Sequence, residues 1–149
     1  MILFHVEEGG QSISDTQVLY LKQWIETIIA ARQGIAGPVN YIFCGDNYLH
    51  RINVEYLQHD TLTDIITFPY DHFPKISGDL FISTERVADN AKELGLPYHD
   101  ELHRVIIHGI LHLCGQGDKT EVEANEMRQL EDWALSLRPQ ELRKLKAGN

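Results

Sequence analysis

Two histidines and an aspartate stand at the spacing of metal ligands. His108 and His112 are four positions apart, so on a helix their side chains project from the same face, about one turn apart. That separation lets two imidazole nitrogens reach one ion at the ~2.0–2.1 Å of a zinc–nitrogen bond. Gly115 follows where a helix end favours a left-handed residue, and Gly117 adds freedom for the chain to fold back and present Asp118. We therefore predict that His108, His112 and Asp118 bind one zinc ion.

The pattern H-x-x-x-H-x-x-G-x-x-D has the spacing of the extended zinc motif H-E-x-x-H-x-x-G-x-x-H of metallopeptidases. Gly109 takes the place of the glutamate that serves those enzymes as general base, and Asp118 takes the place of the third histidine. A carboxylate at ~2.0–2.2 Å is an acceptable zinc ligand. Three protein ligands leave a fourth position for water, whose pKa zinc lowers toward ~7, and this favours a catalytic site. The alternative is that the two histidines have this spacing by chance. Gly115, Gly117 and Asp118 at the matching positions count against that alternative.

Composition limits the number of domains and the classes of function that the chain can have. The 149 residues are 43% hydrophobic, and 22 acidic against 13 basic side chains give a formal charge of −9. No repeat or linker divides the sequence, so we expect a single domain over residues 1–149. The acidic balance argues against a protein that binds nucleic acid over its whole surface, but it permits a small local RNA site.

Cysteine usage and the amino terminus indicate the compartment. Cys44 and Cys114 are 70 positions apart, which favours free thiols in a reducing environment, and Cys114 reads as a small core residue. Residues 1–8 have no basic region and only a short apolar run, unlike a signal peptide. No stretch approaches the ~20 apolar residues of a membrane span. We expect a cytoplasmic protein with no membrane partner.

Hydrophobic periodicity predicts an α+β fold, in which a small mixed four-stranded sheet packs with helices and one helix carries the metal ligands in a zincin-like manner. The expected strands are residues 2–6, 39–44, 65–68 and 79–83. Ser14 or Asp15 is expected to N-cap the first helix and Asp46 the second, and a third helix begins at Ser83 or Thr84. Two more helices are expected over residues 97–113 and 122–137. The last helix carries acidic residues that we expect on its solvated surface: Glu121, Glu123, Glu126, Glu131 and Asp132.

Three segments together resemble a known family. Residues 108–115 read H-G-I-L-H-L-C-G, residues 63–69 read T-D-I-I-T-F-P, and residues 78–83 read G-D-L-F-I-S. They are similar to the H-G-x-L-H-L-x-G-Y-D-H, P-T-D-V-L-S-F-P and G-D-I-x-I-S segments of the YbeY family, bacterial metal-dependent endoribonucleases linked to ribosomal RNA maturation. The resemblance spans most of residues 40–135 in the same order.

The resemblance implies zinc ligands at His108 and His112, with Asp118 where the family has its third histidine. It also exposes a departure, because Leu57 stands where the family has an arginine thought to serve catalysis. No guanidinium is available at that position to contact a phosphate. The side chains that would substitute for it are His59, Lys119 or Arg104, and the sequence does not distinguish among them.

The function that the resemblance implies is metal-assisted hydrolysis of single-stranded RNA, in ribosomal RNA maturation and ribosome quality control. Its partners would be ribosomal RNA and a ribosomal subunit or ribosomal protein. Asp64 is a candidate to orient a ligand histidine or the water, and its structural alternative is to cap the turn before the third strand. Bases would stack on aromatic residues that more often belong to a core, such as Tyr56, Phe68 or Tyr70.

Two other functions stay open. A non-catalytic ribosome-assembly factor would keep the metal as a structural element, and Leu57 in place of the arginine favours it. A metallopeptidase would explain the zincin-like spacing, but Gly109 in place of the glutamate base counts against it.

Overall fold

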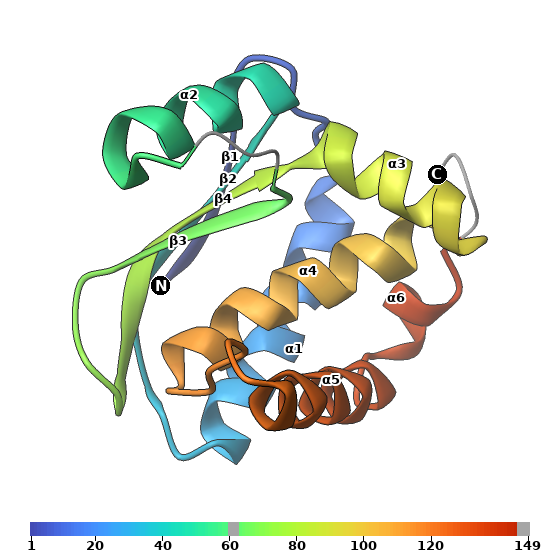
Figure 1. The fold of residues 1–149 in the computed structure, drawn as a ribbon. Coiled ribbons are helices and arrows are strands. Elements are labelled where there is room, and N and C mark those ends of the chain that lie inside the picture. Colours follow the sequence, from blue (N-terminus) through green and yellow to red (C-terminus); the bar gives the residue numbers. More distant parts are fainter. Residues whose placement is uncertain (60–62, 146–149) are drawn as a thin grey trace.

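The computed structural model describes residues 1–59 and 63–145. Along the chain, the elements are β1 (Ile2–Val6), α1 (Asp15–Ala31), β2 (Ile35–Cys44), α2 (Asp46–Leu57), β3 (Ile65–Pro69), β4 (Lys75–Ser83), α3 (Thr84–Leu94), α4 (Tyr98–Leu113), α5 (Glu121–Ser136) and α6 (Gln140–Arg143). Figure 1 shows their arrangement.

The strands form one mixed sheet in the order β1-β2-β4-β3. Strand β2 runs parallel to both β1 and β4, whereas β3 pairs with β4 in the antiparallel sense. The antiparallel pair puts β3 at the sheet edge, where Ile65 lies opposite Ile82 and Pro69 lies opposite Gly78. Proline suits an edge strand because it donates no ladder hydrogen bond. The predicted α+β class with a small mixed four-stranded sheet is confirmed.

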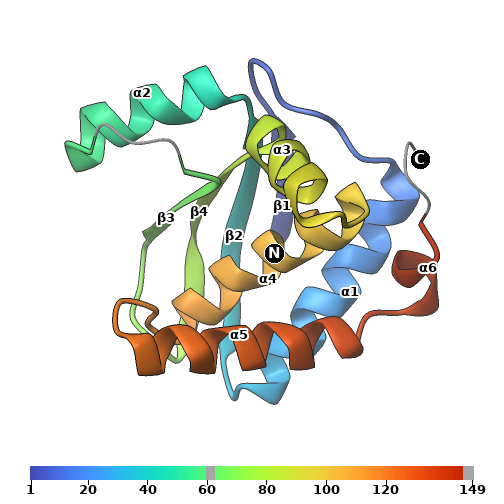
Figure 2. The same ribbon diagram turned by 45° about the vertical axis from the view of Figure 1, so that its right-hand side comes forward.

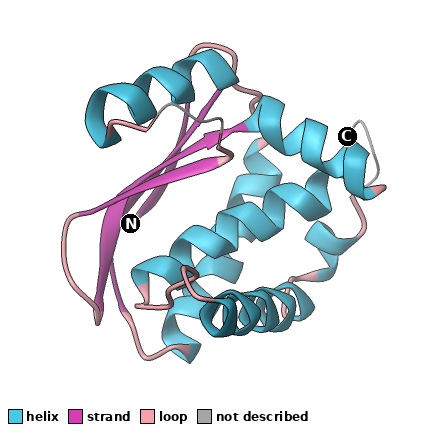
Figure 3. Cartoon of the chain, in the orientation of Figure 1, coloured by secondary structure: helices cyan, strands magenta, loops and turns pink. Residues whose placement is uncertain are grey.

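Helices cover the two faces of the sheet unequally (Figures 2 and 3). Helix α2 lies alone over one face, and α1 and α4 pack on the other, with α5 outside α4 (Figure 2). The main core lies between the sheet and α1 and α4, and its fully buried side chains include Trp24, Phe43, Leu80 and Ile106. A second, smaller cluster of Cys44, Leu49 and Ile66 lies under α2. The edge strand β3 therefore lies between the end of α2 and the flank of α4.

Two strands are longer than their sequence patterns predicted. Strand β2 begins at Ile35 and β4 begins at Lys75, and these two residues are partners in the parallel ladder. A register shift between Ala36 and Val39 accommodates Gly37 and Pro38, two residues that disfavour a regular strand. A bulge of this kind lets a strand continue past a proline. The short helix α6 was not predicted, and its buried Leu142 indicates that tertiary packing holds it.

Helix starts follow the capping rules at two of the three predicted positions. The hydroxyls of Ser14 and Ser83 accept hydrogen bonds from the backbone of the third residue on, as N-caps do. The prediction that Asp46 caps its helix was wrong, because Gly45 is the N-cap and has no side chain to offer. The Asp46 carboxylate instead accepts from the Ser83 hydroxyl at 2.7 Å and from Arg86 at 2.8 Å. It therefore ties α2 to the start of α3.

Helix α4 is the central element of the helical layer. It buries apolar residues on most of its circumference, among them Leu102, Val105, Ile106 and Ile110. Such an all-round apolar helix belongs in a protein interior. The few polar residues of α4 are therefore exceptions on a mostly apolar, buried helix.

In the described residues, no helix is both long and apolar enough to span a bilayer.

Candidate metal and active site

Close packing of α4 against the sheet requires a glycine beside the first histidine. A Cβ atom on Gly109 would lie 2.7 Å from Leu80 Cδ2 and 3.0 Å from Ile65 Cδ1. Those distances are shorter than ordinary carbon contacts, so any larger residue would push the helix away from β3 and β4. Gly109 thus brings His108 close to the edge strand. It also explains physically why no glutamate stands at this position.

The end of α4 turns the chain back toward the histidines, as the glycine spacing predicted. Gly115 has φ +95, in the region that favours glycine, and its N–H donates to the His112 carbonyl. Gln116 N–H then donates to the carbonyl of Leu111, which completes the turn. After this turn Asp118 Oδ2 lies 3.4 Å from His108 Nε2. The turn therefore places Asp118 beside His108.

The other ring nitrogen of His108 is held by Glu131, whose predicted position was wrong. Glu131 was expected on the solvated surface of the last helix, but it is only 6% exposed. Its Oε2 lies 2.7 Å from His108 Nδ1, and its Oε1 accepts from Arg104 at 2.9 Å. A carboxylate behind a histidine fixes the tautomer that keeps Nε2 free for a metal. The signal for Glu131 was its place on the inward-facing side of α5, four residues after Met127, which is also buried.

Electrostatics around this pair follow from its partners. Burial lowers the pKa of His108, but the carboxylates of Glu131, Asp118 and Asp64 outweigh burial and raise this pKa above the usual value. Burial raises the pKa of Glu131, but the hydrogen bonds from His108 and Arg104 outweigh it and lower this pKa. Glu131 is therefore an ionised carboxylate at neutral pH.

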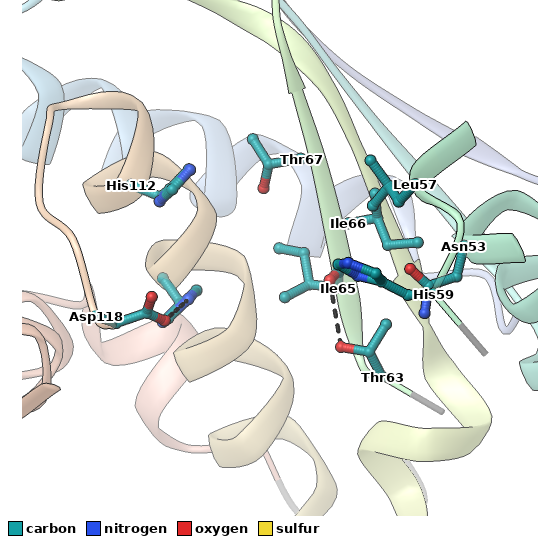
Figure 4. Close-up of a pocket in the computed structure, with 10 residues that line it drawn as sticks. Asn53, Leu57, His59, Thr63, Ile65, Ile66, Thr67, His112 and Asp118 are labelled. Atoms are coloured by element: carbon teal, nitrogen blue, oxygen red, sulfur yellow. Dashed lines mark hydrogen bonds and ion pairs between the residues drawn. The ribbon is translucent and has the colours of Figure 1, made fainter. Parts of the chain in front are cut away.

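His108, His112 and Asp118 all line one cavity of about 280 Å³ in front of α4. Figure 4 shows His112 and Asp118 on the α4 side and His59, Leu57 and Asn53 on the side of α2 and β3. Within residues 1–59 and 63–145, no three His, Cys, Asp or Glu side chains are already close enough to hold a metal ion. The structure thus brings the three predicted ligands to one cavity, with contact between His108 and Asp118.

Asp64 lies on the far side of His108 from this cavity. It lines a second cavity of about 180 Å³, together with Glu101, Arg104 and Glu131. Burial raises the pKa of Asp64, and His108 and backbone N–H groups oppose the rise. Its carbonyl accepts from Ser83 N–H at 2.9 Å, which closes the start of β3 onto β4. The proposed role of Asp64 in orienting a ligand stays a prediction, since the hydrogen bond described for His108 Nδ1 goes to Glu131.

The three candidates for the missing cation lie in different places. Arg104 donates to Glu131 and, at 2.7 Å, to Asp132, and it lines the cavity behind His108. Lys119 is exposed and is not among the residues that line the front cavity. His59 does line it, next to Leu57.

Other side chains are clear of the site. Cys114 is buried with a free thiol, as predicted for a small core residue. His103 is fully buried, where its Nδ1 lies 2.9 Å from an Arg138 nitrogen and its ring faces Trp24. The aromatic residues Tyr56 and Phe68 line a separate groove under α2.

Comparisons with known proteins show which proteins this chain is similar to. A family model described as Endoribonuclease YbeY matches residues 7–137. Proteins named Endoribonuclease YbeY are 52% identical in Flavobacterium johnsoniae (76% of this chain and 82% of the relative) and 44% identical in Flavobacterium psychrophilum (92% and 96%). The relative of the same name in Bacteroides thetaiotaomicron is 46% identical, over 87% of this chain and 94% of its own. The solution structure of TM1509 from Thermotoga maritima has the same fold, with a TM-score of 0.67 at 24% identity over 100% of this chain and 99% of that one. The chain belongs to the Endoribonuclease YbeY family.

Proposed function

We propose that residues 1–149 form a single metal-dependent hydrolase domain, a zinc-dependent endoribonuclease that cleaves single-stranded RNA in the cytoplasm. Its role is in ribosomal RNA maturation and ribosome quality control. The observation that carries the proposal is His108, held between the buried carboxylate of Glu131 and Asp118 at the edge of a cavity. The relatives named Endoribonuclease YbeY support the reaction class.

The donor set suits zinc. With Nδ1 of His108 held by Glu131, Nε2 faces Asp118 and is left for a metal. His112 is exposed and lines the same cavity, so its side chain can turn toward the other two donors without disturbing the core. When bound, zinc supplies Lewis-acid stabilisation of phosphate charge and acidifies water.

The protein's own residues orient the candidate ligand His108 and close one side of the cavity. Glu131 fixes the His108 ring, and Arg104 in turn fixes the other oxygen of Glu131. Gly109 holds this assembly against Leu80 and Ile65, so that β3 closes one side of the cavity. Asp64, behind His108, serves as a positioning carboxylate for the ligand or for water.

The size and charge of the cavity indicate its substrate. A volume of about 280 Å³ lies just below the roughly 300–1,000 Å³ of ligand pockets, which suits one phosphodiester of a single strand. No lysine or arginine is among the described residues that line it, and the chain has a formal charge of −9. Naked RNA would therefore bind weakly, and a ribosomal subunit or ribosomal protein would bring the ribosomal RNA close.

RNA cleavage tests the proposal. Purified protein loaded with zinc should cut a single-stranded RNA internally, and a chelator should stop the reaction. His108→Ala should lose the activity, whereas His72→Ala, which changes an exposed histidine outside the cavity lining, should keep it. If the zinc-loaded protein leaves both single-stranded and structured RNA intact, the enzymatic proposal fails.

The assembly-factor alternative is favoured by one feature, the apolar Leu57 in the cavity lining. It predicts that His108→Ala still co-sediments with ribosomal subunits and supports normal ribosomal RNA processing in cells. The metallopeptidase alternative lacks a base, because a side chain at position 109 would collide with Leu80 and Ile65. A peptide-cleavage assay tests it.

A further inference from the structure

The cavity in front of α4 has two chemically different sides. The α4 side carries His108, His112 and Asp118, the candidate metal ligands. The opposite side, which we call the α2–β3 wall, is lined by residues from the end of α2 to β3: Asn53, Leu57, His59, Thr63, Ile65, Ile66 and Thr67. His59 is the one ionisable side chain among these described wall residues, and Figure 4 shows it across the cavity from His112 and Asp118.

The end of α2 fixes the position of His59. Gln58 adopts the left-handed conformation with φ 57, and its N–H donates to the carbonyl of Asn53. The N–H of His59 donates to the same carbonyl at 3.1 Å, six residues back. Both N–H groups thus converge on one carbonyl, and a left-handed residue directly after the last helical residue is a common way for a helix to end and turn the chain sharply. These backbone hydrogen bonds therefore fix where the chain places His59 beside the cavity.

Thr63 and Arg104 are less suited than His59 to contact a substrate anion. Thr63 Oγ1 donates to the carbonyl of Ile65 at 3.5 Å, so its hydrogen is directed within its own turn. Arg104, the nearest arginine to His108 along the chain, is paired with Glu131 and Asp132 and lines the cavity behind. An imidazole carries an N–H group in either protonation state, and this group can donate a hydrogen bond to a phosphate oxygen.

We infer that His59 binds a phosphate of the RNA substrate from the α2–β3 wall, on the other side of that phosphate from His108, His112 and Asp118. This inference rests on the proposed RNA substrate and adds a substrate-contacting residue to it. The phosphate would then lie between a donor on one side and the metal donors on the other. Because the contact is a hydrogen bond to an anion, its loss should weaken substrate binding more than it changes later steps.

The first test measures binding. A short fluorescent single-stranded RNA should bind His59→Ala about tenfold more weakly than wild type, the effect of losing one hydrogen bond to a charged group. His59→Lys, which supplies another N–H donor, should recover most of the affinity. The control is His72→Ala, which should bind as wild type does. Cleavage kinetics should show a raised KM for His59→Ala with a smaller change in kcat.

The second test reads the contact directly. Inorganic phosphate added to the zinc-loaded protein should shift the imidazole NMR signals of His59 and leave those of His72 in place. Gln58→Val disfavours the left-handed conformation and should weaken RNA binding with His59 intact, whereas Gln58→Gly should not. A thermal-unfolding midpoint for each variant separates this effect from loss of folding.

The results separate the two proposals. If His59→Ala binds RNA as tightly as wild type and phosphate leaves the His59 signals unmoved, the inference is overturned, even where the enzyme cleaves RNA. If phosphate and RNA bind through His59 but zinc-loaded wild type does not cleave, the inference stands and the proposed endoribonuclease activity fails.

Discussion

His108 and Glu131 are 23 positions apart in the chain, yet Nδ1 of one lies 2.7 Å from Oε2 of the other. The contact joins α4 to α5 at a point where Glu131 is buried and held by Arg104 as well. A buried carboxylate of this kind has few stable arrangements without its partners, because an unpaired buried charge costs several kcal/mol. The pair therefore links the stability of the helical layer to the orientation of the first candidate metal ligand.

Replacing Glu131 should weaken metal binding more than it disturbs the fold. Glu131→Gln keeps the shape but removes the charge behind His108, and loss of such a partner lowers metal affinity roughly 10–100-fold. Competition with a fluorescent zinc chelator measures the affinity. Asp132→Asn is the matched control, since Asp132 also pairs with Arg104 but makes no described contact with His108. Equal losses in both variants would show that the Arg104 pairing, and not the His108 contact, matters.

Adding a methyl group at Gly109 should destabilise the protein. Alanine is the better helix former by roughly 1 kcal/mol, but its Cβ would meet Leu80 and Ile65 at 2.7 and 3.0 Å. Overpacking of a core costs about 1–3 kcal/mol, so the net free energy of unfolding should fall. Urea unfolding measures it. Leu80→Val in the same chain should recover part of the loss, and a Gly109→Ala protein as stable as wild type would contradict the packing argument.

The buried His103 on α4 should make the free energy of unfolding depend on pH. Burial, with Arg138 and His99, lowers the pKa of His103 to about 3, against about 6.5 in the unfolded chain. Between these values the unfolded state binds more protons than the folded state. The contribution of neutral His103 to the free energy of unfolding is therefore fully present above pH about 6.5 and is lost as the pH drops toward 3. The loss for this group is about 2 kcal/mol between pH 6.5 and 5.

Urea unfolding at both pH values checks this expectation. His103→Gln keeps a hydrogen-bond acceptor for Arg138 but does not titrate, so its stability should fall less over the same interval. His72→Ala, at an exposed position, should follow the wild type. A His103→Gln protein that loses as much stability as wild type would assign the pH dependence to other groups.

RNA affinity should depend only weakly on salt. No lysine or arginine is among the described residues of the front cavity, so few phosphates are neutralised. For a single strand the slope of log K against log salt is about −0.7 per neutralised phosphate, and we expect a slope no steeper than about −1.4. Fluorescence anisotropy at a series of potassium chloride concentrations measures it. A slope several times steeper would reveal a basic RNA-binding surface elsewhere on the chain.

Local patterns predicted the fold and part of the site. Helical spacing located His108 and His112, and the glycine that follows α4 predicted the turn that returns Asp118 to within 3.4 Å of His108. Serine caps marked the starts of α1 and α3. These features depend on a few neighbouring residues, so one sequence contains the information.

What the sequence did not predict depends on contacts between distant segments. Glu131 looked like one of several surface acids on α5, because its only local signal is the apolar Met127 four residues earlier, and its partners His108 and Arg104 come from the distant helix α4. Asp46 looked like a helix cap, but the nearby Ser83 and Arg86 hold it instead. The first residues of β2 were missed because Gly37 and Pro38 argue locally against a strand, and only pairing with β4 across the sheet overrides them.

The central claim is that His108, His112 and Asp118 hold one zinc ion. Elemental analysis after zinc loading and extensive dialysis, performed on the wild type and on single alanine variants of these residues, tests it most directly. The account predicts one zinc per chain in the wild type and in His72→Ala, and a large loss of zinc in His108→Ala, His112→Ala and Asp118→Ala. A wild-type protein that retains no zinc, or three variants that retain as much as wild type, would contradict it.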